Sequence, residues 1–105
     1  MPENKNALTE VVYYILLSLY SPLHGYGIMQ NVGEISGGRM NLGPGTLYGA
    51  INTLLGKNWI EPVVGDDKSR KKEYIITDKG RRIIKGEIVR LEELIKNGRK
   101  IVEEN

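Results

Sequence analysis

The sequence lacks cysteine entirely: none of its 105 residues is one. This absence excludes disulfides, thiolate zinc sites and cysteine nucleophiles together. The chain also has no apolar run that approaches the roughly 20 residues of a membrane span, and its first residues lack the pattern of a signal peptide. We therefore expect a cytoplasmic protein with no membrane partner.

Groups for acid–base chemistry are scarce as well. His24 is the sole histidine, and no cluster of carboxylates accompanies a base. A catalytic base needs a partner that orients it, so we expect no enzyme activity and no cofactor. The pair Asp66-Asp67 fits ordinary turn chemistry better than a metal site, so no metal is expected either.

Positive charge is sparse in the first half of the chain. Before residue 58 the lysines and arginines are Lys5, Arg39 and Lys57. The net charge of +2 does not by itself indicate a nucleic-acid partner. The other basic residues cluster from Lys68 onward, around one predicted turn, so any cationic surface is expected there.

What the chain does have is apolar residues at helical spacing, over the length of one ordinary domain. A first helix is expected over residues 8–20, with Thr9 as its cap and Ser21-Pro22 as its end. A second is expected over 25–36, ended by Gly37-Gly38, because glycine readily takes the left-handed conformation beyond a helix.

A third helix is predicted to begin at Gly43-Pro44, because proline fits the first helical position. Its inward positions are Leu47, Ile51 and Leu54. Its opposite face is small and polar, and consists of Gly45, Gly49, Asn52, Thr53 and Gly56. Glycine costs a helix roughly 1 kcal/mol relative to alanine. We therefore favour a face that contacts another molecule over an ordinary solvated face.

A hairpin follows, with strands over residues 59–64 and 72–77. Pro62 indicates that the first strand has an exposed side. Residues 65–69 form the turn. Trp59 is expected to pack rather than to bind a ligand.

The last helix is expected over residues 78–102, with Thr77 as its N-cap. Its apolar residues recur at spacings of four and three, as in a coiled-coil seam. A helix of this length cannot bury the whole stripe on so small a body, so a second copy of the chain is the simplest partner. The alternative is packing on the first helix of the same chain, and both can hold together. The expected dimer residues are Val11, Ile15, Ile84, Ile88, Leu91, Leu94, Ile95 and Val102.

The order of these elements predicts a winged helix-turn-helix: mainly α with a small β-hairpin and a long C-terminal dimerisation helix. We divide it into a DNA-binding domain, residues 1–77, and a dimerisation helix, residues 78–105. The third helix then enters the major groove of double-stranded DNA, and the basic hairpin tip contacts phosphates. Thr46, Asn52 and Thr53 offer hydrogen bonds to bases or phosphates.

Three motifs resemble those of PadR-type regulators. They are residues 24–28 (HGYGI), residues 42–48 (LGPGTLY) and the run 69–80 (SRKKEYIITDKG). The resemblance implies a transcriptional repressor that binds an inverted-repeat operator as a homodimer through its C-terminal helix. It also implies that Tyr26, Thr46 and Tyr48 lie at the DNA face. With the residues argued above, the expected DNA contacts are Tyr26, Pro44, Gly45, Thr46, Tyr48, Asn52, Thr53, Ser69, Arg70, Lys71 and Lys72.

The resemblance also implies that a small-molecule effector can bind, because some such regulators bind drugs or aromatic compounds at the dimer centre. Their best-known drug site uses a tryptophan on the last helix. This chain has no aromatic residue after Tyr74, so we do not expect its last helix to stack against a planar drug. The alternative function is a winged-helix module that binds proteins rather than DNA, and the basic turn argues against it.

Overall fold

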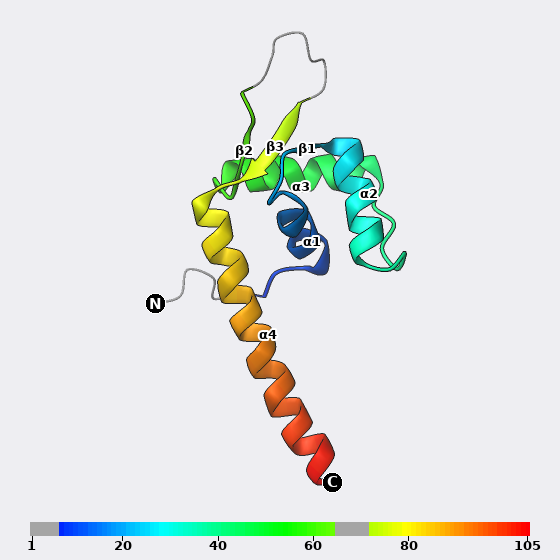
Figure 1. Cartoon of the computed structure of the whole chain (residues 1–105), viewed down its shortest axis with the longest axis vertical. Coiled ribbons are helices and arrows are strands. Elements are labelled where there is room, and N and C mark those ends of the chain that lie inside the picture. Colours follow the sequence, from blue (N-terminus) through cyan, green and yellow to red (C-terminus); the bar gives the residue numbers. More distant parts are fainter. Residues whose placement is uncertain (1–6, 65–71) are drawn as a thin grey trace.

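A computed structural model describes residues 7–64 and 72–105. Helices α1 to α3 come first, a small sheet is completed by the hairpin, and a long helix ends the chain (Figure 1). The elements are α1 (Glu10–Ser18), β1 (Leu23–His24), α2 (Gly25–Ile35), α3 (Pro44–Gly56), β2 (Ile60–Pro62), β3 (Glu73–Ile76) and α4 (Asp78–Glu104). This is the winged helix-turn-helix that the order of sequence patterns predicts.

Helix α1 lies at the centre of the body and packs against α2 and α4 (Figure 1). Thr9 caps it as expected, because its hydroxyl accepts the Val12 N–H at 3.2 Å. Ile15, Leu16 and Leu19 of this region are fully buried. They join the inward residues of α2 and α3 in one core, so burial of these apolar stripes holds the three helices together.

The sheet has three strands in the order β1-β3-β2, all antiparallel. Strand β2 is therefore an edge strand. This agrees with the prediction from Pro62, because proline cannot donate a backbone hydrogen bond to a neighbouring strand. Strand β1 was not expected, because its two residues, Leu23 and His24, carry no strand pattern of their own. They pair with Tyr74 and Glu73 across about fifty residues of chain, a contact that local sequence does not encode.

The link between α2 and α3 turns on two glycines. Gly37 and Gly38 have φ of 65° and 82°, and Gly38 N–H donates to the Gly33 carbonyl at 2.8 Å. This is the glycine ending that the sequence predicts for α2. An ion pair between Arg39 and Glu10 then joins this link to α1.

Helix α4 begins in the core and ends far from it (Figure 1). Thr77 caps it: its hydroxyl accepts the Gly80 N–H at 3.1 Å and donates to the Asn58 carbonyl at 2.6 Å. Ile83 and Ile84 are buried, whereas every residue from Glu92 onward is exposed. The described residues consequently span 60 Å in the longest direction, against 33 and 20 Å in the other two.

Candidate nucleic-acid interface

Helix α3 presents one buried face and one face of small or polar side chains. Leu47, Ile51 and Leu54 are buried in the core, as the sequence predicts. The exposed residues of the other side are Gly45, Thr46, Tyr48, Gly49, Asn52, Thr53 and Gly56. Nothing lies within 4 Å of a side chain built at Gly45 or Gly49, so these glycines leave open surface along the helix. A polar, shallow helix face suits close approach to a hydrated groove.

The N-terminus of α3 is open to solvent. Gly43 is the N-cap, and glycine has no side chain that can accept hydrogen bonds from the first amides of the helix. Pro44 occupies the first turn, and both Pro44 and Gly45 are exposed. Uncapped amides at a helix N-terminus favour an anionic group such as a phosphate.

The Tyr48 side chain reaches from α3 to the start of α2. Its side chain is 47% exposed, and its hydroxyl end lies against Gly25, the first residue of α2. A β-carbon at Gly25 would overlap the Tyr48 hydroxyl, so a larger residue there requires the Tyr48 side chain to move. Tyr48 therefore packs against the start of α2 and remains partly exposed to solvent.

Tyr26 lies in the first turn of α2, and its side chain is 61% exposed. Its hydroxyl accepts a hydrogen bond from the Gln30 side-chain amide at 3.3 Å, and its ring lies 6.4 Å from that of His24. An exposed phenol held by its neighbours can donate its own proton to an acceptor such as phosphate. The position is consistent with the expected role of Tyr26.

The wing is only partly described. Strands β2 and β3 form its base, and Lys72, just before β3, is exposed. Ser69, Arg70 and Lys71 lie outside the described residues, as does the turn expected over 65–69. Their contact with DNA stays a prediction from the sequence.

Helix α4 carries a second exposed surface, and this one is apolar. We call it the distal face; its members are Ile88, Leu94, Ile95, Ile101 and Val102, which are all exposed. Leu91 lies in the same stripe and is half-buried, as is Val11 of α1. Val89 is also exposed, but helical spacing places it on another side of α4. Apolar side chains gathered on one projecting helix indicate an unfilled protein contact.

Two residues expected at the dimer interface lie elsewhere. The side chains of Ile15 and Ile84 are 0% and 1% exposed within one chain. They are core residues of α1 and α4 that pack inside the body, as the alternative reading of the stripe allowed. They leave no surface for a partner, so we remove them from the proposed interface.

Sequence reasoning missed a buried charge where α4 leaves the core. Glu87 is 2% exposed, and its carboxylate accepts two hydrogen bonds from the Arg90 guanidinium, both at 2.7 Å. It also accepts the Leu8 backbone N–H at 3.2 Å. The bonds from Arg90 lower the pKa of Glu87, against the opposing effect of burial. The carboxylate thereby fastens residues before α1 to α4.

No helix in the described ranges is both long and apolar enough to cross a membrane. Over the same ranges, no three histidine, cysteine, aspartate or glutamate side chains gather as metal ligands would.

Residues 14–86 match the PadR-like family of transcriptional regulators. The match covers more than half of the sequence and includes the second half of α1, all of α2 and α3, the wing and the start of α4. This chain belongs to the PadR-like family. The family consists of transcription regulators rather than enzymes.

A curated relative is an uncharacterised 37.1 kDa protein in transposon Tn4556 of Streptomyces fradiae, 39% identical over 66 residues. That alignment covers 63% of this chain but 18% of the relative, so the chain spans under a fifth of that protein's length.

Two solved structures share the fold. One is a PadR family transcriptional regulator from Eggerthella lenta, with a TM-score of 0.76 and 22% identity, covering 90% of this chain and 83% of that one. The other is Bacillus subtilis PadR in complex with operator DNA, with a TM-score of 0.61 and 24% identity. The second alignment covers 75% of this chain and 46% of that chain.

Proposed function

We propose that this PadR-like protein is a sequence-specific DNA-binding repressor that acts as a homodimer on an inverted-repeat operator in the cytoplasm. The observation that carries the proposal is the exposed face of α3, which is small, polar and open at its N-terminus. Membership of a family of transcriptional regulators supports it. So does the shared fold with a protein solved on its operator DNA.

The base-reading contacts in this proposal come from α3. Thr46 and Asn52 offer hydrogen-bonding groups to base edges or phosphates, and the open glycines let the helix backbone come near. The Thr53 hydroxyl already donates to the Gly49 carbonyl at 3.2 Å, so it acts as an acceptor toward DNA. Pro44 and Gly45 place the first amides of the helix at a phosphate.

The wing and Tyr26 supply phosphate contacts. Lys72 is exposed beside β3, and the sequence places Ser69, Arg70 and Lys71 before it in the basic turn. Replacing Arg70 and Lys72 with alanine should weaken binding to all sequences and lower the salt slope by about one unit per lost contact. An unchanged salt slope would remove the wing from the mechanism.

The dimer in this proposal forms through the distal face of α4. Two heads that read successive half-sites on one side of DNA lie about 34 Å apart, one helical turn. The inverted repeat follows from the twofold symmetry of such a dimer. Release of the repressor from DNA by a small-molecule effector is compatible with this dimer. The residues of the distal face do not identify the chemical class of such an effector.

The deciding experiment is selection from a pool of random duplexes at near-physiological salt, followed by sequencing of the bound fraction. The proposal predicts an enriched inverted repeat with half-sites about one turn apart. The matched control is the same selection with Asn52→Ala and Thr46→Ala, which should lose the motif while keeping nonspecific binding. If the unaltered protein enriches no motif and binds DNA weakly, the chain is instead a protein-interaction module.

A further inference from the structure

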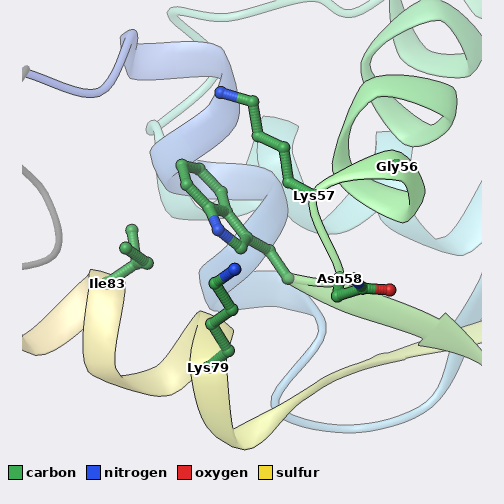
Figure 2. Close-up of a pocket in the computed structure, with 6 residues that line it drawn as sticks. Gly56, Lys57, Asn58, Lys79 and Ile83 are labelled. Atoms are coloured by element: carbon green, nitrogen blue, oxygen red, sulfur yellow. The ribbon is translucent and has the colours of Figure 1, made fainter.

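A pocket lies where α3 ends, β2 begins and α4 begins, away from the exposed middle of α3. We call it the elbow pocket. Its volume is about 530 Å³, within the range of small-molecule sites. Figure 2 shows its lining residues, which are Gly56, Lys57, Asn58, Trp59, Lys79 and Ile83.

The elbow pocket combines the aromatic ring of Trp59 with the positive charges of Lys57 and Lys79. The Lys57 ammonium lies 4.7 Å from the centre of the Trp59 ring. Lys79 lines the same pocket from the first turn of α4, while Asn58 points away from Lys57 and Lys79 (Figure 2). No acidic side chain is among the described residues that line the pocket. Two ammonium groups without a carboxylate between them favour an anion.

The backbone that carries Trp59 is held firmly. Its N–H donates to the Leu54 carbonyl at 3.1 Å, and its carbonyl accepts the Thr77 N–H at 3.0 Å. Gly80 lies so near that a β-carbon there would overlap the Trp59 carbonyl oxygen. These contacts fix the backbone of Trp59, and its side chain packs against the core, so little of the site needs to be ordered when a ligand binds.

We propose that the elbow pocket binds a free mononucleotide. A planar base matches the half-buried indole, because bases of any sequence stack on aromatic side chains. A phosphate monoester carries a charge of about −1.5 to −2 at pH 7, which matches two lysines better than a single carboxylate does. Lys57 is exposed, so its flexible chain can move from the ring face to the phosphate and leave that face to the base.

The position of the site gives binding a structural consequence. Lys57 is the C-cap residue of α3, and Lys79 lies in the first turn of α4. A phosphate held by both lysines therefore joins the proposed reading helix to the proposed dimerisation helix. This regulatory consequence rests on the proposed function, whereas binding itself does not, so the test below needs no DNA to succeed.

Trp59 is the sole tryptophan of the chain, so its fluorescence reports on this pocket alone. Titration of the intact protein with adenosine monophosphate should quench Trp59 along a saturable curve. Adenosine without the phosphate and inorganic phosphate without the base should each bind about tenfold more weakly, because each lacks one half of the recognition.

Variants localise the effect. Lys57→Met combined with Lys79→Met should weaken binding of adenosine monophosphate about tenfold or more, whereas Lys85→Met, also on α4 and exposed, should leave it unchanged. Trp59→Leu should weaken it similarly by calorimetry, and Trp59→Phe should restore most of the affinity. Circular dichroism checks that each variant is folded.

Three outcomes would overturn the proposal. The first is the absence of saturable quenching by the nucleotide. The second is equal affinity in the unaltered protein and the double lysine variant. The third is quenching by duplex DNA that blocks the nucleotide, which would assign the elbow pocket to the DNA backbone. None of these would by itself refute DNA binding through α3.

Discussion

Helices α3 and α4 both expose a face, and the two faces have opposite chemistry. Helix α3 is buried along one side for its whole length, and its outer side holds glycine, threonine and asparagine. Helix α4 is buried only at its start, and its outer end holds Leu94, Ile95, Ile101 and Val102. Water solvates the first face at little cost, whereas the second leaves apolar area exposed.

The difference indicates two kinds of partner. Water molecules can hydrate a small polar face both in the free protein and in a complex, as they do at protein–DNA interfaces. An apolar face on a projecting helix is stabilised by a dry contact with protein, and a second copy of the chain is the simplest one. If the proposed function holds, one short chain separates recognition of DNA from recognition of itself, and variants of α3 and α4 test that separation.

The largest effect is expected on the distal face. Ile95→Lys with Val102→Lys should raise the dimer dissociation constant about a thousandfold, because two charges would be desolvated without partners. Analytical ultracentrifugation over a concentration series measures it. Asn97→Lys adds a lysine on the polar side of the same helix and should leave the dimer intact. A double variant that sediments as the dimer would place the interface elsewhere.

Two glycines of α4, one in close contact with the body and one facing open space, should respond to alanine in opposite senses. Gly80→Ala should lower the free energy of unfolding by about 2 to 3 kcal/mol, since its methyl group would overlap the Trp59 carbonyl. Gly86→Ala meets nothing within 4 Å and should raise it by about 0.5 to 1 kcal/mol through helix propensity. Urea denaturation measures both. Equal effects would show that the close approach of α4 to Trp59 is not a constraint.

Glu87 marks the boundary between the two parts of α4 and should make stability sensitive to acid. Its pKa is lower in the folded chain than in the unfolded chain, because Arg90 stabilises the carboxylate. The stabilisation is therefore complete above the unfolded pKa and is lost as pH falls through the folded pKa.

Glu87→Gln should lower the free energy of unfolding at pH 7 by about 1.5 to 3 kcal/mol, because it removes charge-assisted hydrogen bonds. The pH dependence of urea midpoints should flatten below pH 5 in this variant relative to the exposed control Glu92→Gln. Parallel pH profiles for the two variants would contradict the assigned role of Glu87.

The smallest effect separates folding from recognition on α3. Gly49→Ala meets open space, so it should stabilise the fold by about 0.5 to 1 kcal/mol. The same methyl group would stand between the α3 backbone and the DNA, so operator affinity should fall. Thermal unfolding and a binding titration on the selected operator measure the two changes. Affinity that rises with stability would show that this face does not approach DNA.

Much of the fold was predictable because its signals are local. The caps at Thr9 and Thr77, the glycine ending at Gly37-Gly38 and the proline start of α3 each act within one helical turn, and the structure confirms them. The inward residues of α3 followed from helical spacing alone. Strand β1 was missed, because its pairing with β3 depends on residues far away in the sequence.

The candidate site was predictable to a lesser degree. Polar and glycine positions on α3 were visible as one helical face, but the sequence could not show that Tyr48 would pack on Gly25. The apolar stripe of α4 was read as one seam, although its first part serves the core and its last part is exposed. A periodic pattern states which residues share a face and is silent on what covers that face.

The sequence by itself determined the order of the four helices and the hairpin, the caps of several helices and the family, since propensity, capping and motif spacing are properties of neighbouring residues. The tertiary structure decided where α4 leaves the body, because that depends on how much surface α1 offers it. It also decided that Glu87 is buried where it accepts the Leu8 N–H, and that Lys57, Trp59 and Lys79 line one pocket. Each of these sites joins residues far apart in the sequence, which only the packed chain brings together.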